Sequence, residues 1–251
     1  MADVVSKAFM LDKIPIDGKS ILLVQEETSS PFFHSFVAQS AKVGRNICLI
    51  SFNQNVNYYH NVGTRLGWNS KTLQSKDKFV FIGGLPSSKD PSSDPASDPF
   101  DFLYEETEFS MKTLITMIRD AVGKWGPAPV TLFIDELNSL LNLGVPMKDV
   151  VTFYQYCRAM VKATDFANVA LIVSSGNTLN DPEGTQCSAL LSHWSHLVLT
   201  EKGLQTGLSK DLSGTITMNW NIAPFHRQQY QFKSYERGIR TFAPGTCSAV
   251  L

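Results

Sequence analysis

The order of hydrophobic and polar residues along the chain predicts alternating strands and helices. Mainly apolar runs indicate strands buried on both faces, and they occur at residues 21–25, 47–52, 79–82, 130–134 and 169–173. Apolar residues at helical spacing predict helices over residues 32–43, 55–66, 100–122, 136–144 and 146–163. Buried strands separated by helices are typical of a parallel sheet covered on both sides, so we expect an α/β fold.

The last fifty residues follow a different pattern, because polar and apolar residues alternate without interruption over residues 215–222. Such alternation predicts a half-exposed antiparallel strand. Two hairpins are predicted, one pairing 204–209 with 215–222 through a turn at 211–214, the other pairing 230–235 with 239–242 across 236–238. A mostly parallel sheet flanked by helices, with an antiparallel β extension at the C-terminus, is the outline of RecA-like ATPase domains. We predict a single RecA-like domain over residues 1–251, with the C-terminal hairpins within 203–243.

One segment inside this domain has the composition of a flexible loop. Every residue of 86–99 except Ala96 is Pro, Ser, Asp or Lys, so the segment has no apolar residues with which to join a core. The strand and helix patterns continue after it, and we therefore predict a surface loop rather than a linker between domains.

Length, charge and cysteine usage exclude several classes of function. A chain of 251 residues is an ordinary size for one α/β domain, and its net charge of −1 gives no long-range attraction to nucleic acids or anionic membranes. No apolar run approaches the roughly 20 residues of a membrane span. The cysteines are far apart and form no CxxC pair, which indicates reduced intracellular thiols; they are Cys48, Cys157, Cys187 and Cys247.

The segment between the first predicted strand and helix differs from a phosphate-binding loop. Such a loop needs glycines whose N–H groups wrap the phosphates, a lysine that reaches them, and a Ser or Thr for magnesium. Here the segment reads Glu26-Glu27-Thr28-Ser29-Ser30-Pro31, with no glycine, no lysine and two carboxylates that would repel phosphates. We expect no functional phosphate loop and no cofactor, and we expect the chain to bind partners rather than nucleotides.

Asp135 and Glu136, at the end of an apolar run, are the residues that most resemble catalytic groups. In a working ATPase the first carboxylate would hold magnesium through water, and the second would activate the attacking water. Alternatively, Asp135 caps a helix that begins at Glu136, where an acid stabilises the positive helix end. Without a phosphate loop we favour the cap, regard the pair as a vestige of the magnesium motif, and predict no catalytic residue.

A metal site is also not expected. His193 and His196, with Cys187 upstream, have an HxxH spacing, but no fourth ligand is visible. If residues 194–200 form a strand, the two histidines face opposite sides of the sheet. His34 lies on a predicted helix, where a packed or half-exposed histidine is the ordinary interpretation.

Aromatic and basic side chains are mixed along the predicted C-terminal hairpins. This composition favours a protein interface, with Trp220, Phe225 and Tyr235 as candidates. A solvated sheet ranks second, and an RNA surface on which bases stack ranks third.

Several motifs, taken in order, resemble one known family, the sixth subunit of the Elongator complex. The matching segments are Ser51-Phe52, Tyr58-Tyr59-His60-Asn61-Val62-Gly63, Leu66-Gly67, Phe133-Ile134-Asp135-Glu136-Leu137, Leu140-Leu141-Asn142-Leu143-Gly144, Phe153-Tyr154-Gln155-Tyr156-Cys157-Arg158-Ala159, Ser195-His196-Leu197-Val198-Leu199, Gly203-Leu204-Gln205-Thr206-Gly207, Phe242-Ala243-Pro244-Gly245 and Ser248-Ala249-Val250-Leu251. The resemblance covers nearly everything from residue 20 onward.

The resemblance implies a function that the residues alone do not reveal. Members of this family are RecA-like, lack the phosphate loop, and assemble with the paralogous Elongator subunits four and five into a hetero-hexameric ring. The ring supports modification of tRNA wobble uridine by handling tRNA, while catalysis resides in another subunit of the complex. The resemblance thus implies a non-enzymatic subunit in the cytoplasm and nucleus, which contacts the Elongator catalytic core and reaches tRNA through the ring.

In a RecA-like ring, the loop after the strand at 169–173 is expected to face the central pore. Gly176, Asn177 and Thr178 are therefore candidate RNA contacts, but residues 175–185 contain two acids and no basic residue. Because phosphate contacts depend on Lys and Arg, we expect this subunit to add little tRNA affinity.

Two alternative functions remain open. One is a degenerate ring ATPase subunit that uses a partner's phosphate loop and retains an active Glu136. The other is a RecA-like accessory protein that binds single-stranded DNA.

Overall fold

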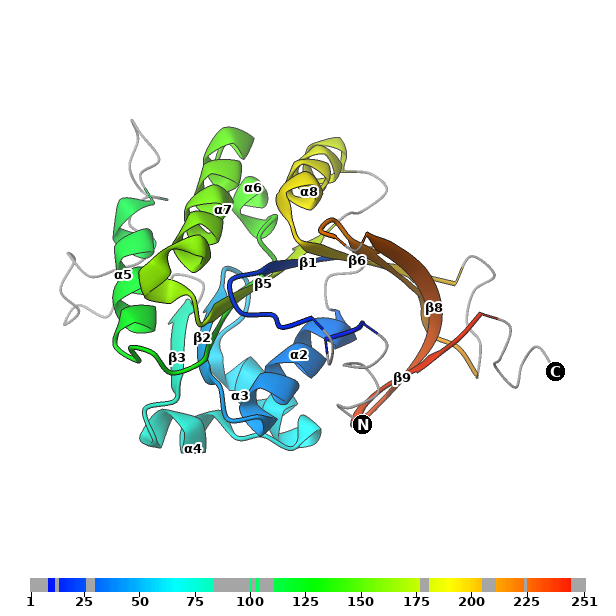
Figure 1. Ribbon diagram of the computed structural model, residues 1–251, viewed down its shortest axis with the longest axis horizontal. Coiled ribbons are helices and arrows are strands. Elements are labelled where there is room, and N and C mark those ends of the chain that lie inside the picture. The colour runs from blue at the N-terminus through cyan, green and yellow to red at the C-terminus, as the bar shows by residue number, and fades with distance from the viewer. Residues whose placement is uncertain are drawn as a thin grey trace.

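A computed structural model describes residues 9–11, 14–25, 30–83, 100, 103, 111–176, 181–204, 211–223 and 225–244. Its centre is one nine-stranded sheet with the strand order β3-β2-β4-β5-β1-β6-β7-β8-β9 (Figure 1). The strands are β1 Ser20–Gln25, β2 Asn46–Ser51, β3 Phe79–Gly83, β4 Val130–Asp135, β5 Val169–Gly176, β6 Leu197–Gly203, β7 Gly214–Trp220, β8 His226–Tyr235 and β9 Gly238–Phe242. The helices are α2 Pro31–Lys42, α3 Val56–Leu66, α4 Ser70–Ser75, α5 Lys112–Gly123, α6 Ser139–Asn142, α7 Met147–Lys162 and α8 Pro182–Trp194, with a 3₁₀ turn η3 at Thr164–Phe166.

The first six strands form the parallel half of the sheet, and the mainly apolar runs predicted five of them, β1 to β5. β1 lies between β5 and β6, and β4 lies between β2 and β5, all in parallel pairs. Every residue of β1, β2 and β4 is buried, because helices cover both faces of this half. Helices α5, α6, α7 and α8 lie on one face and α2, α3 and α4 on the other (Figure 1).

β7, β8 and β9 continue the sheet as an antiparallel extension that curves around α2 (Figure 1). β7 alternates buried and half-buried residues along its whole length, which agrees with the alternation in its sequence. The predicted second hairpin is confirmed, since Tyr235 pairs with Gly238 across Glu236 and Arg237. The parallel core with its antiparallel C-terminal strands confirms the predicted fold class.

The interface role predicted for Trp220 is wrong, because its side chain is only 1% exposed within the chain itself. It belongs to the core between the curved sheet and α2, where its indole Nε1 donates a hydrogen bond to the carbonyl oxygen of Phe9 at 3.3 Å. The Phe9 ring packs against Phe32 of α2, with the ring centroids 5.7 Å apart. Phe9 and α2, both from the N-terminal part of the chain, therefore cover the apolar face of β7. Phe225 is 78% exposed and Tyr235 is 47% exposed, so both remain interface candidates.

Three other expectations from the sequence need correction. The partner of β7 is Leu197–Gly203 rather than residues 204–209, because β6 extends straight from the parallel sheet into the antiparallel pair. α5 begins at Lys112 rather than near residue 100. α4 and α8 were not predicted, although Asp181 followed by Pro182 is a typical helix start. The predicted loop at 86–99 lies outside the described residues.

The described helices can be compared with the length and hydropathy that a membrane-spanning helix needs. None of them is both long enough and apolar enough to span a bilayer.

Candidate functional site

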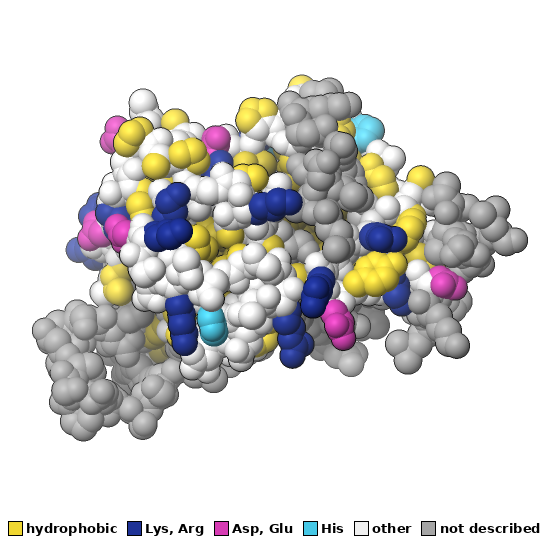
Figure 2. All heavy atoms as spheres, turned by 90° about the horizontal axis from the view of Figure 1, so that it is seen from below, with side chains coloured by type: hydrophobic (Ala, Val, Ile, Leu, Met, Phe, Trp, Pro, Cys, Tyr) yellow, Lys and Arg dark blue, Asp and Glu magenta, His cyan; other side chains and the backbone are white. Residues whose placement is uncertain are grey.

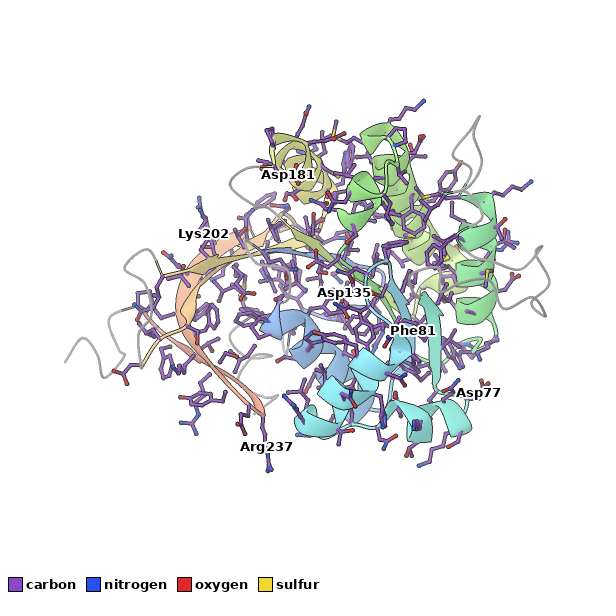
Figure 3. All side chains as sticks on the ribbon, turned by 180° about the vertical axis from the view of Figure 1, so that it is seen from behind. Asp77, Phe81, Asp135, Asp181, Lys202 and Arg237 are labelled. Carbon is purple, nitrogen blue, oxygen red and sulfur yellow. The ribbon has the colours of Figure 1, made fainter. Side chains whose placement is uncertain are left out.

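The carboxyl ends of β1, β2, β4 and β5 meet at one edge of the sheet, the usual place for ligands in open α/β folds. The strand register sets Ser51 beside Asp135 and Gln25 beside Gly176. The site comprises Gln25, Ser51, Tyr59, Asp135, Glu136, Ser174 and Ser175, and Figure 3 shows Asp135 where this edge meets the helices. We refer to this group as the strand-end cluster.

Both carboxylate oxygens of Asp135 accept hydrogen bonds from the protein. Tyr59, on α3, donates its hydroxyl to Oδ2, and Ser174, on β5, donates its hydroxyl to Oδ1 at 2.7 Å. The predicted capping role of Asp135 is wrong, because α6 begins only at Ser139 and has no side-chain cap. Asp135 instead joins α3, β4 and β5.

Glu136 is held in an unusual backbone conformation. Its φ of +54° lies in the left-handed region, which costs a non-glycine residue about 1–3 kcal/mol. Its backbone N–H donates to the Ser174 hydroxyl at 2.7 Å, and its Oε1 accepts a hydrogen bond from Gln25 Nε2. The side chain is thereby directed back into the protein, where it is only 6% exposed.

The two adjacent carboxyl groups have different electrostatic environments. Burial, followed by the charge of Asp135, raises the pKa of Glu136 to about 8. Burial also raises the pKa of Asp135, but the hydrogen bonds from Tyr59 and Ser174 oppose this effect. Because Asp135 has two hydroxyl donors, we assign the negative charge of the pair to Asp135 and the proton to Glu136 at neutral pH. One buried oxygen beside this pair, Oε1 of Gln25, has no partner among the described residues.

The beginning of α2 is also occupied by groups of the protein. The Ser30 hydroxyl accepts hydrogen bonds from the N–H groups of Phe32 and Phe33, which are the donors that a phosphate would otherwise use. The same hydroxyl donates to the Glu201 carboxylate at 2.7 Å. Pro31, at the first helical position, has no N–H to offer.

A hollow of about 420 Å³ lies next to this helix start. Its described lining includes the carboxylate of Glu201 but no Lys or Arg. Among the described lining residues, anionic phosphates would therefore meet a carboxylate and no Lys or Arg, which disfavours a nucleoside triphosphate. Glu26 and Glu27, which the sequence places nearest to the phosphate position, lie outside the described residues.

The candidate pore-loop residues are only partly described. Gly176 ends β5, and its carbonyl oxygen accepts a hydrogen bond from Asn138 Nδ2 at 2.6 Å, whereas Asn177 and Thr178 lie outside the described residues. The acidic residues that were assigned to this loop belong to α8 instead. Asp181 caps the helix by accepting from the Gly184 N–H at 2.8 Å, and Glu183 lies in the first turn.

His193 and His196 lie in different surroundings. His193 lies on α8 and is exposed to solvent. His196 accepts a hydrogen bond at Nδ1 from the Ser20 N–H at 2.9 Å. No group of three or more His, Cys, Asp or Glu side chains suited to a metal occurs in the described ranges. Cys48, Cys157 and Cys187 are buried free thiols, and burial raises the pKa of Cys48 and Cys187 to about 12. His34 packs against Tyr58, with Nε2 3.1 Å from the tyrosine hydroxyl.

Sequence reasoning found the two carboxylates but missed the residues that surround them. Gln25 ends one apolar run and Ser174 directly follows another. A polar residue at the end of a buried strand could have been recognised as a candidate site residue. Tyr59 looked like an ordinary apolar position of a helix. The partners lie 111, 39 and 76 residues away from the carboxylates, so only the folded chain brings them together.

The fold and the strand-end cluster together define a RecA-like α/β domain with buried carboxylates at the ends of its strands. In agreement with this class, the chain superposes on a KaiC-like protein from Pyrococcus horikoshii with a TM-score of 0.63, at 13% identity over 90% of each chain. A family model described as Elongation complex protein 6 matches residues 9–240. The chain is 32% identical to Elongator complex protein 6 of Rattus norvegicus and 31% identical to that of Homo sapiens, with 93% of each chain covered. The chain belongs to the Elongation complex protein 6 family.

Proposed function

We propose that this chain is a non-catalytic subunit of the Elongator complex. In this proposal it assembles with the paralogous subunits four and five into a hetero-hexameric RecA-like ring. The ring binds tRNA and supports wobble-uridine modification by the catalytic core of the complex, in the cytoplasm and the nucleus. Membership of the family and the RecA-like fold support the assembly, and the strand-end cluster supports the absence of catalysis.

One observation carries the non-catalytic role. The two carboxylates that would hold magnesium and activate water are already engaged by Tyr59, Ser174 and Gln25. A magnesium–nucleotide complex would have to displace these partners from a buried position. Nothing in the described wall of the adjacent hollow compensates for the charge of the phosphates.

Nucleotide binding is tested by calorimetry of the full-length chain with magnesium-ATP, from which we expect no heat of binding. A micromolar dissociation constant for the isolated chain would refute the non-catalytic proposal. The alternative of a ring ATPase that borrows a partner's loop is tested on the assembled ring. Glu136→Gln should leave any ATP hydrolysis by the ring unchanged, whereas loss of hydrolysis with the ring intact would assign catalysis to Glu136.

Ring assembly is tested with the two exposed aromatic side chains of the antiparallel extension. Phe225→Asp and Tyr235→Asp should leave the fold intact and weaken co-purification with the paralogous subunits. Tyr156→Asp is a matched control, because Tyr156 is 58% exposed but lies on α7. Equal effects of all three substitutions would remove the support for an interface at the two ends of β8. Partner identity after affinity purification separates this proposal from a single-stranded DNA accessory protein.

The contribution of this subunit to tRNA binding is tested at Glu183. Asp181 is unsuitable because its substitution would also remove the cap of α8. Glu183→Gln in the whole ring should give equal or slightly tighter tRNA binding across a salt titration. A large loss of affinity with an intact ring would show that the carboxylate makes a specific contact.

A further inference from the structure

A large groove lies on the face of the sheet opposite α5 and α7. It has a volume of about 1120 Å³ and runs between α2, the turn from α3 into α4, and the tip of the β8–β9 hairpin. Figure 2 shows this face from below, with Lys and Arg side chains distributed over it. We refer to it as the α2–α3–β9 groove; its volume exceeds the roughly 300–1,000 Å³ typical of small-molecule pockets.

The side chains of the groove carry an excess of positive charge. Lys42, Arg65 and Arg237 line it together with a single acid, Glu236, which gives +3 − 1 = +2, against −1 for the whole chain. None of the three cations has a salt-bridge or side-chain hydrogen-bond partner among the described residues. Lys42 and Arg65 lie in the last turns of α2 and α3, where the helix dipole favours them. Arg237 lies in a hairpin turn, where no helix dipole stabilises its charge.

The rest of the lining mixes apolar residues with Ser35, Thr64, Asn69 and Thr72. Half-buried side chains of Ala38, Ala41, Leu66 and Leu73 contribute to it. Trp68 also lines the groove, but its ring packs against Gly63 and Phe79 and is only 8% exposed. The groove therefore has apolar stretches with cations and small polar side chains among them, and its described lining contains no exposed aromatic ring.

This combination distinguishes between classes of occupant. Single-stranded nucleic acid binds such surfaces through bases stacked on exposed aromatic rings, and the buried ring of Trp68 does not provide one. A protein segment with alternating apolar and acidic side chains fits both the apolar walls and the cations. β9 borders the groove and is the last strand of the sheet among the described residues, so an extended segment has a strand edge available for pairing.

We propose that the α2–α3–β9 groove binds an extended acidic segment of a partner protein. Apolar side chains of the segment pack against α2 and Leu66, and its carboxylates pair with Arg65 and Arg237. The indole N–H of Trp68, which is buried and has no partner among the described residues, lies in the same wall and reports on occupancy. The groove is distinct from the strand-end cluster, so the proposal goes beyond the proposed function and does not depend on it.

The test uses the full-length chain and a synthetic twelve-residue peptide of alternating Glu and Leu with blocked ends. We expect the peptide to change the fluorescence of Trp68 and to bind with a salt-dependent affinity. Trp68→Phe should abolish the fluorescence change while calorimetry still detects binding. Matched peptides with Gln or Lys in place of Glu should bind at least about tenfold more weakly, because each lost ion pair contributes to the affinity.

The protein variants make the test specific to the groove. Arg65→Glu with Arg237→Glu should weaken binding of the Glu peptide by about tenfold or more and should favour the Lys peptide instead. Arg119→Glu with Lys148→Glu changes the net charge equally but on α5 and α7, and should have no comparable effect. Circular dichroism and thermal unfolding check that both double variants are folded.

Three outcomes would overturn the proposal. One is the absence of Glu-peptide binding at millimolar concentration, and another is equal binding of the Glu and Gln peptides. The third is tighter binding of a twelve-nucleotide oligouridine than of the Glu peptide, which would assign the groove to nucleic acid. None of these outcomes would affect the test of nucleotide binding, so the two proposals stand or fall separately.

Discussion

The substitution Glu136→Gln separates the charge of this side chain from its shape. Glu136 is buried, and its Oε1 accepts a hydrogen bond from Gln25 Nε2. Glutamine has nearly the same shape as protonated glutamate and carries no charge. Its amide can keep the hydrogen bond from Gln25 and can donate to Oε1 of Gln25, which has no partner among the described residues.

The expected change in the free energy of unfolding follows from the pKa of Glu136, which rises from 4.5 to about 8 on folding. A carboxyl group whose pKa is higher in the folded state contributes its full stability below pH 4.5, and this contribution is lost as the pH rises through 8. At about 1.4 kcal/mol per pKa unit, the difference 8 − 4.5 = 3.5 sets a limit of about 5 kcal/mol. Relaxation around the charged group reduces this value, and we expect Glu136→Gln to raise the free energy of unfolding at pH 8 by about 1–3 kcal/mol.

The assay is urea unfolding of the wild-type chain and the variant at pH 5 and at pH 8. We expect near-equal stabilities at pH 5 and a more stable variant at pH 8. Glu236→Gln, in the exposed hairpin turn, controls for the general loss of a negative charge. A variant that is less stable than the wild type at pH 8, or an effect that does not change with pH, would refute the assignment of the proton to Glu136.

Three further predictions concern the framework around the site. Trp220→Ala should lower the free energy of unfolding by about 3–5 kcal/mol in urea titrations, because the ring is buried, whereas Phe225→Ala should change it by less than about 0.5 kcal/mol. Asp181→Ala should cost about 0.5–2 kcal/mol through loss of the α8 cap, and Asp181→Asn should retain most of the stability; equal losses would argue against the cap. Gly83→Ala should disrupt the pairing of β2 with β3, because a Cβ atom would lie 2.2 Å from the carbonyl oxygen of Ser51; a normally stable variant by thermal unfolding would contradict this.

The local sequence determined most of the secondary structure. The apolar runs identified the five strands β1 to β5, because a strand covered by helices on both faces consists mainly of apolar residues. The side chain of Asn55 caps the start of α3, and Gly67 ends the helix with a left-handed φ of +83°. These features depend on neighbours within a few residues, so they can be read from the chain itself.

The tertiary structure decided which groups are buried and which are partnered. The alternation in 215–222 indicated that Trp220 shares a face with Ile216 and Met218, but not that α2 and Phe9 cover that face. The pair Asp135 and Glu136 was visible in the sequence, whereas its hydrogen-bond partners come from other elements.

The burial of Trp220 and the environment of the two carboxylates were not predictable for the same physical reason. Strand alternation fixes only the direction of side chains relative to the local backbone. Burial and pKa depend on the atoms that long-range packing brings alongside them. The role of the carboxylates was therefore decided by Gln25, Tyr59 and Ser174, which approach Asp135 and Glu136 only when β1, α3 and β5 pack around β4.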